Sequence, residues 1–173
     1  MTTPYLHEDA AAEEGRSRTA YPDPLSPLGK ACRAKGISPI NYKVLPGYAA
    51  LSGKPWTIGC GATGEGISPS TVWTEAQIDA DLDARLEHIK GVLDMKLPWW
   101  RHLKDERQDV VTLLSYQLGI EGFLKFHHAI SAMQSADYAT AAAELLDSEW
   151  ASQTPARAKR MARQMLTGVR AWE

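Results

Sequence analysis

The sequence has few cysteines, no long apolar run and almost no net charge. Two cysteines, Cys32 and Cys60, among 173 residues are too few for a disulfide scaffold, and they lack the C-x-x-C spacing of a structural zinc site. No segment approaches the roughly 20 apolar residues of a membrane span. Basic side chains number 19 and acidic ones 21, a balance that argues against nucleic-acid binding through bulk positive charge. We therefore expect a single globular domain without cofactor, metal ion, nucleic-acid partner or stable membrane association.

The start of the chain, from Met1 to Glu14, is acidic and has no apolar signal core. This composition predicts a protein that stays in the cytosol in which it is made. In that reducing compartment Cys32 and Cys60 are expected to be free thiols. A bridge between them is the alternative if the protein reaches an oxidising periplasm.

Apolar spacing and caps predict helices over most of the sequence after residue 73. Thr74 and Gln77 form a capping-box pattern, and the apolar residues that follow at spacings of three and four predict a connecting helix over about 74–93. Residues 105–118 are apolar on most faces, which is typical of a buried core helix. Caps and apolar spacing predict further helices over 4–14, 27–35, 129–134, 138–150 and 155–166.

Residues 21–70 are rich in proline and glycine, which favours loops and a hairpin around one short helix. Within this part, the segment 56–61 mixes β-branched and aromatic residues with glycine, which indicates a short twisted strand. The sequence therefore predicts an α+β, predominantly helical fold in one domain, 1–173. Its expected parts are a small β-hairpin lobe (about 15–73), the connecting helix, and an all-helical lobe (about 94–173) packed with helix 4–14.

Two carboxylates near the N-terminus, Glu14 and Asp23, are candidates for acid–base chemistry. Splitting a glycosidic bond requires one carboxyl group to protonate the leaving oxygen and another to activate water or to attack. The segment 15–22 is long enough for the chain to leave the helix and turn back, so that the two side chains face each other. On spacing alone, two solvated surface carboxylates are the simpler interpretation.

Motifs around the pair carry more information. Glu14-Gly15 is followed by Tyr21-Pro22-Asp23 and by the run TIGCG that starts at Thr57. Downstream come SYQLG, from Ser115, and above all SEWASQTPARAKR, from Ser148 to Arg160. In order and spacing the sequence resembles the phage-type lysozymes, a family of endolysins, and its C-terminal part resembles the T-even phage members. The resemblance covers nearly the whole chain and implies a two-lobed lysozyme-like fold with a cleft between the lobes.

The resemblance also implies an activity and the residues that perform it. The activity would be that of a muramidase, which hydrolyses the β-1,4 bond between N-acetylmuramic acid and N-acetylglucosamine in peptidoglycan with inversion. Glu14 would be the general acid, Asp23 the carboxylate that positions or activates water, and Thr57 the hydroxyl that helps to hold that water. Residues that match the saccharide cleft of the family are Gln117, Phe126, Gln153 and Thr154, although Phe126 also suits a core and Thr154 a helix cap.

Ion pairs and partners follow from the same resemblance. It places Arg157 beside Glu14, and Arg160, three residues further on the same helical face, can reach Glu13. Trp150 sits at core spacing, and His127 and His128 lack ligands at metal-binding spacing. The protein would be a monomer that waits in the host cytoplasm until a holin opens the membrane and then acts on glycan strands of the periplasmic wall, lysing the host.

One segment departs from the family pattern. Residues 24–55 form an insertion between Asp23 and the TIGCG strand, where family members have a short turn. We expect the insertion to enlarge one lip of the cleft, and its deletion to change substrate preference more than fold stability. Three other interpretations remain: a catalytically silent wall-binding or structural phage module of the same fold, a related glycosidase that acts on chitin, and nucleic-acid binding through the basic C-terminal helix.

Overall fold

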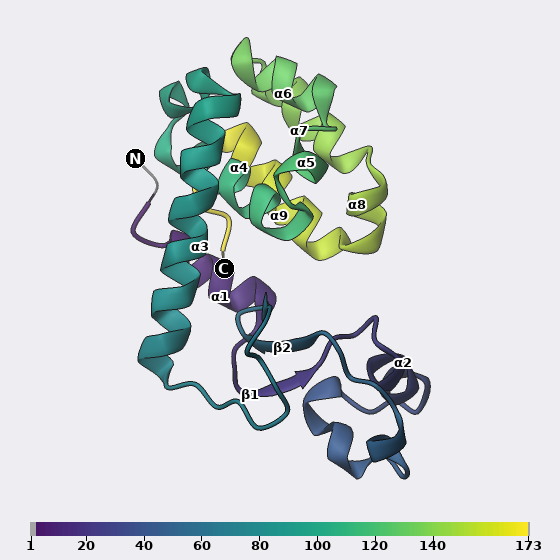
Figure 1. The fold of residues 1–173 in the computed structure, drawn as a ribbon. Coiled ribbons are helices and arrows are strands. Elements are labelled where there is room, and N and C mark those ends of the chain that lie inside the picture. The colour runs from purple at the N-terminus through teal and green to yellow at the C-terminus, as the bar shows by residue number, and fades with distance from the viewer. Residues whose placement is uncertain (1–2, 173) are drawn as a thin grey trace. The chain divides into compact units, whose positions relative to one another are not determined.

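The computed structural model describes residues 3–172 and is predominantly helical, with a small antiparallel sheet (Figure 1). This confirms the predicted α+β class. The α-helices are α1 (Leu6–Glu14), α2 (Pro27–Ala34), α3 (Glu75–Lys96), α4 (Asp105–Leu118), α5 (Ile120–Phe123), α6 (His127–Gln134), α7 (Tyr138–Leu146), α8 (Glu149–Gln153) and α9 (Pro155–Thr167). The strands are β1 (Ser17–Pro22), β2 (Trp56–Gly59) and β3 (Ala62–Thr63), and short 3-10 helices are η1 (Pro39–Val44), η2 (Tyr48–Ala50) and η3 (Pro98–His102).

The chain forms two compact units. One comprises Met1–Glu13 with Ala84–Glu173, and the other comprises Glu14–Asp83. Helix α3 contributes residues to both units, and it begins with the predicted capping box. The Thr74 N–H donates to Gln77 Oε1 at 2.8 Å, and the Gln77 N–H donates back to Thr74 Oγ1 at 3.2 Å.

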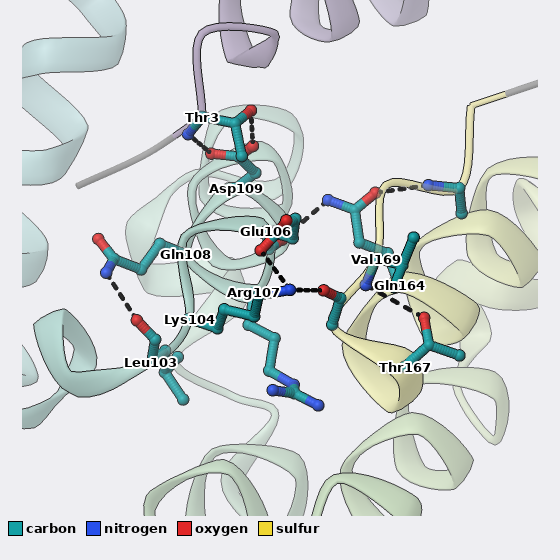
Figure 2. Close-up of polar contacts among 12 residues, drawn as sticks. Thr3, Leu103, Lys104, Glu106, Arg107, Gln108, Asp109, Gln164, Thr167 and Val169 are labelled. Atoms are coloured by element: carbon teal, nitrogen blue, oxygen red, sulfur yellow. Dashed lines mark hydrogen bonds and ion pairs between the residues drawn. The ribbon is translucent and has the colours of Figure 1, made fainter.

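Helix α4 is the core of the helical unit. Its residues from Gln108 to Ser115 are buried, as its apolar composition predicts. Figure 2 shows how polar groups join α4 to the end of α9. Lys104 Nζ donates to the carbonyl of Gly168 at 2.6 Å, and Gln164 Nε2 donates to the carbonyl of Glu106 at 2.8 Å. The first bond satisfies a backbone carbonyl at the C-terminal end of α9, and the second ties α9 to the second residue of α4.

Three predicted helix boundaries are wrong. The helix expected over 138–150 is divided, because the Ser148 hydroxyl accepts the N–H of Ala151 at 3.1 Å and starts α8 as a new helix. Helix α6 starts at His127, two residues earlier than expected. Helix α1 starts at Leu6 rather than Pro4. The Thr3 hydroxyl accepts the N–H of Tyr5 at 3.2 Å, as a cap does, and Thr3 also binds the carboxylate of Asp109 through its N–H and hydroxyl.

The sheet of the second unit has one apolar and one polar face. Its order is β1-β2-β3, and both pairs are antiparallel. Directly paired residues share a face, so Tyr21, Thr57 and Thr63 form one row across the sheet. Pairs on the opposite face are Pro22 with Trp56 and Ile58 with Ala62.

The insertion 24–55 supplies much of the core beneath the apolar face. The buried cluster consists of Ala20, Leu28, Cys32, Tyr42, Leu45, Trp56, Ile58 and Ala62. The Tyr42 ring contacts the Trp56 ring edge to face, with centroids 5.3 Å apart. Because these side chains bury the sheet, we no longer expect deletion of the insertion to spare the fold.

Both cysteines are buried thiols. Cys32 belongs to the apolar cluster of the insertion. No helix in the part of the chain described, 3–172, has both the length and the apolar composition to cross a membrane.

Candidate active site

Glu14 is the last residue of α1 and is partly buried. Gly61, in the turn between β2 and β3, has a positive φ of 82°, which favours glycine. A Cβ atom at Gly61 would lie 3.9 Å from Glu14 Oε2. The β2–β3 turn therefore passes directly beside the Glu14 carboxylate.

Asp23 follows β1 and is held by backbone hydrogen bonds. Its N–H donates to the carbonyl of Pro55 at 3.0 Å and to that of Gly53 at 3.3 Å. Its Oδ1 accepts the N–H of Leu25 at 2.7 Å, the geometry of an Asx turn. One carboxylate oxygen thus holds the loop, and the side chain remains partly exposed.

Tyr21 also belongs to the candidate site, although no feature of this position taken alone points to it. Burial raises the pKa of its phenol, and the negative charges of Glu14 and Asp23 raise it further. Its signal in the sequence was its place in the Tyr21-Pro22-Asp23 motif. The strand register places Tyr21 directly opposite Thr57.

The hydroxyl of Thr57 is buried in the sheet. The residue is only 5% exposed, and its Oγ1 has no hydrogen-bond partner within residues 3–172. A buried polar group left unpaired costs about 1–3 kcal/mol, so such groups in native proteins call for an explanation such as a functional role or a bound water. Glu14, Tyr21, Asp23 and Thr57 all belong to the unit Glu14–Asp83.

The other predicted site residues lie in the helical unit. Phe126 and Gln153 line a pocket of about 430 Å³ together with Trp150. Gln117 is not among the lining residues; its Oε1 accepts the indole N–H of Trp150 at 3.0 Å. Trp150 itself is buried, as its spacing predicts.

Thr154 occupies the first position before α9, but its hydroxyl does not cap that helix. It donates instead to the carbonyl of Trp150 at 3.0 Å. The interpretation of its side chain as a cap is therefore wrong. The predicted start of the helix after Thr154 is confirmed, with Pro155 as its first residue.

Two arginines of α9 converge on Glu13. Arg157 donates through Nε to the Glu13 carboxylate and through a second nitrogen to the Glu13 carbonyl at 2.6 Å. Arg160 donates to Glu13 Oε1 at 2.5 Å, which confirms that predicted pair. The Glu13 side chain is 8% exposed, so this is a largely buried network. The pair of Arg157 with Glu14 stays a prediction.

Comparison with known proteins identifies the family. The phage lysozyme family model matches residues 33–168, which is most of the chain. The chain belongs to the phage lysozyme family. Thr57 lies inside the matched range, whereas Glu14 and Asp23 precede it. The family supports a muramidase function of the endolysin type in general terms.

A curated relative is the pre-baseplate central spike protein Gp5 of Enterobacteria phage T4. It is 34% identical over 71 residues, which make up 41% of this chain and 12% of that protein. The matched part is thus a small portion of a longer phage protein.

Proposed function

We propose that this phage lysozyme hydrolyses the β-1,4 bond between N-acetylmuramic acid and N-acetylglucosamine in peptidoglycan. The observation that supports the proposal best is the buried hydroxyl of Thr57, which has no hydrogen-bond partner among the described residues. It is buried on the polar face of the sheet, opposite Tyr21, whose pKa is raised by burial and then by the negative charges of Glu14 and Asp23. A water bound to that hydroxyl would lie in a carboxylate-rich environment suited to hydrolysis.

In the proposed mechanism Glu14 donates a proton to the glycosidic oxygen as the bond to the anomeric carbon breaks. Asp23 accepts a proton from the water, whose oxygen bonds to the anomeric carbon from the opposite side. The product therefore has inverted configuration, a course that needs the two carboxyl groups roughly 6.5–9.5 Å apart. Thr57 would hold this water through its hydroxyl group.

Substrate binding is proposed for residues of the helical unit. Phe126 is partly buried and packs against Phe123, with ring centroids 6.5 Å apart. Gln117, Gln153 and Thr154 would contribute hydrogen bonds to glycan hydroxyl and acetamido groups. Arg157 would support the acid from the neighbouring helix.

In the proposed biological setting the enzyme is a monomer in the host cytoplasm. It would reach the periplasmic wall when a holin permeabilises the membrane, and it would lyse the host by cutting glycan strands. The similarity to a central spike protein favours a second candidate, a module of a phage particle that binds the wall with or without cleavage.

Digestion of purified Gram-negative sacculi tests the proposal. The wild type should release fragments with N-acetylmuramic acid at the reducing end, and the anomer formed first should be inverted. Glu14→Gln and Asp23→Asn should each lose at least about 100-fold in rate. The control Glu65→Gln, which alters an exposed carboxylate of the same unit, should retain full rate. Binding to sacculi without release of fragments would favour the silent module, and faster cleavage of chitin would favour the alternative substrate.

A further inference from the structure

Both ends of the insertion 24–55 make hydrogen bonds to the backbone of Asp23. At the distal end, the carbonyls of Gly53 and Pro55 accept the Asp23 N–H. At the proximal end, the Asp23 carbonyl accepts the N–H of Ser26 at 2.9 Å and the Ser26 hydroxyl at 2.7 Å. Both backbone polar groups of Asp23 are therefore fixed by the segment in which this chain departs from the family pattern.

Ser26 joins this arrangement to helix α2. Its side chain is buried, and the same oxygen that donates to Asp23 accepts the N–H of Gly29 at 3.0 Å. Ser26 is the N-cap of α2, so one hydroxyl both starts the helix and holds the Asp23 carbonyl. The helix in turn is anchored in the apolar core by Leu28 and Cys32.

Gly29 sets how closely α2 approaches Asp23. A Cβ atom at Gly29 would lie 2.1 Å from the Asp23 carbonyl oxygen and 2.9 Å from Pro24 Cα. Both obstacles are backbone atoms, which cannot move aside as a flexible side chain can. Any larger residue at position 29 must therefore displace α2 or Asp23.

We propose that the insertion is a positioning device for Asp23, with Ser26 and Gly29 as its positioning residues. This inference rests on the proposed function, in which Asp23 activates the water. A base displaced by about 1 Å can cost about 100-fold in rate. The insertion would thus replace the short turn of other family members as the element that aims this carboxylate.

Two variants with matched controls test the proposal. Gly29→Ala adds the obstructing Cβ, and Ser26→Ala removes the hydroxyl that binds the Asp23 carbonyl. Gly91→Ala adds a Cβ in open space, and Ser38→Ala alters a helix cap whose side chain makes no capping bond. At a temperature where all variants are folded by circular dichroism, Gly29→Ala and Ser26→Ala should lower kcat about 10- to 100-fold with KM within twofold. Both controls should stay within twofold of the wild type.

A double-mutant cycle separates positioning from general damage. In an Asp23→Asn background, Gly29→Ala and Ser26→Ala should change the residual kcat less than twofold, because the side chain that they position has already lost its role. Equal losses in both backgrounds would overturn the proposal. So would a kcat of Gly29→Ala within twofold of the wild type.

Amide exchange measures the position of Asp23 without relying on turnover. The exchange rate of the Leu25 N–H depends on its hydrogen bond to the Asp23 carboxylate. The exchange rate of the Asp23 N–H depends on its hydrogen bonds to the carbonyls of Gly53 and Pro55. Both amides should exchange at least about 10-fold faster in Gly29→Ala and Ser26→Ala, and at wild-type rate in Gly91→Ala and Ser38→Ala. An inactive wild type would refute the proposed function, whereas unchanged exchange would refute the positioning role.

Discussion

Tyr21 and Thr57 are directly paired residues of neighbouring antiparallel strands. Their side chains lie on the same, polar face of the sheet. The Thr57 hydroxyl there is buried and has no hydrogen-bond partner in the part of the chain that the structure describes. A buried hydroxyl without a partner within the protein is unfavourable for folding. At the proposed water site, stability and activity are therefore expected to change in opposite directions, and both can be measured.

We predict that Thr57→Val makes the protein more stable and less active. Valine has nearly the same shape as threonine without the hydroxyl, so the free energy of unfolding should rise by about 1 kcal/mol. The same change removes the proposed hydrogen bond to water, and kcat should fall at least about 10-fold. Denaturant unfolding and sacculus digestion measure the two effects. Thr57→Ser, which keeps the hydroxyl, should recover most of the activity; a stable and fully active Thr57→Val would contradict the proposed role.

The insertion should contribute strongly to the stability of its unit. Leu28 is 1% exposed and belongs to the apolar cluster, whereas Leu25, three residues earlier, is 71% exposed. Leu28→Ala should lower the free energy of unfolding by about 2–5 kcal/mol, and Leu25→Ala by less than about 0.5 kcal/mol. Equal effects of the two substitutions in urea unfolding would show that the cluster is not a core. Replacement of residues 24–55 by a short linker should abolish cooperative unfolding of this unit.

Local signals in the sequence predicted most of the fold. Helix α4 is recognisable because its side chains are apolar on most faces, and α3 because its capping box is local. The break between α7 and α8 was missed, since the residues on both sides suit a helix and only the Ser148 hydroxyl decides the boundary. The bonds between Thr3 and Asp109 could not be predicted, because the two residues lie 106 positions apart in the sequence.

In the candidate site, too, some features can be predicted from local sequence and others depend on the tertiary structure. The motifs predict Glu14, Asp23 and Thr57 as candidate residues, because their order and spacing can be compared within a family. The neighbourhood of Tyr21 follows from strand register, which no local pattern specifies. The tight contact between Gly29 and Asp23 depends on how the insertion folds back. In the sequence, Gly29 is therefore indistinguishable from any other glycine in a predicted helix.

The network at Glu13 should be important for stability. Breaking a buried ion pair leaves an uncompensated charge, so Glu13→Gln should destabilise the protein by about 3 kcal/mol. Arg157→Gln should cost more than Arg160→Gln, because the Arg157 side chain is more buried and also binds the Glu13 carbonyl. Glu8→Gln is the control: Glu8 is 72% exposed and lies 3.5 Å from Arg170, so its loss should cost less than about 1 kcal/mol. Equal costs for Glu13→Gln and Glu8→Gln in thermal unfolding would contradict this account.

The buried carboxyl of Asp109 should make stability depend on pH. Burial raises its pKa from 3.8 to about 6, although Thr3 binds the charged form through its N–H and hydroxyl (Figure 2). The folded protein therefore retains this proton at a pH where the unfolded chain has lost it. Asp109 thus disfavours the folded state above pH 6, and this penalty disappears as the pH falls below the unfolded pKa.

Between pH 5 and pH 7.5 this carboxyl alone should lower the free energy of unfolding by about 1 kcal/mol. Asp109→Asn removes the titrating group, so the difference between wild type and variant should change by that amount across the interval. Urea unfolding at both pH values measures it. Asp147→Asn, which alters an exposed carboxyl of the same unit, should follow the wild type. A constant difference between wild type and Asp109→Asn would mean that the Thr3 hydrogen bonds offset the burial of the charge completely.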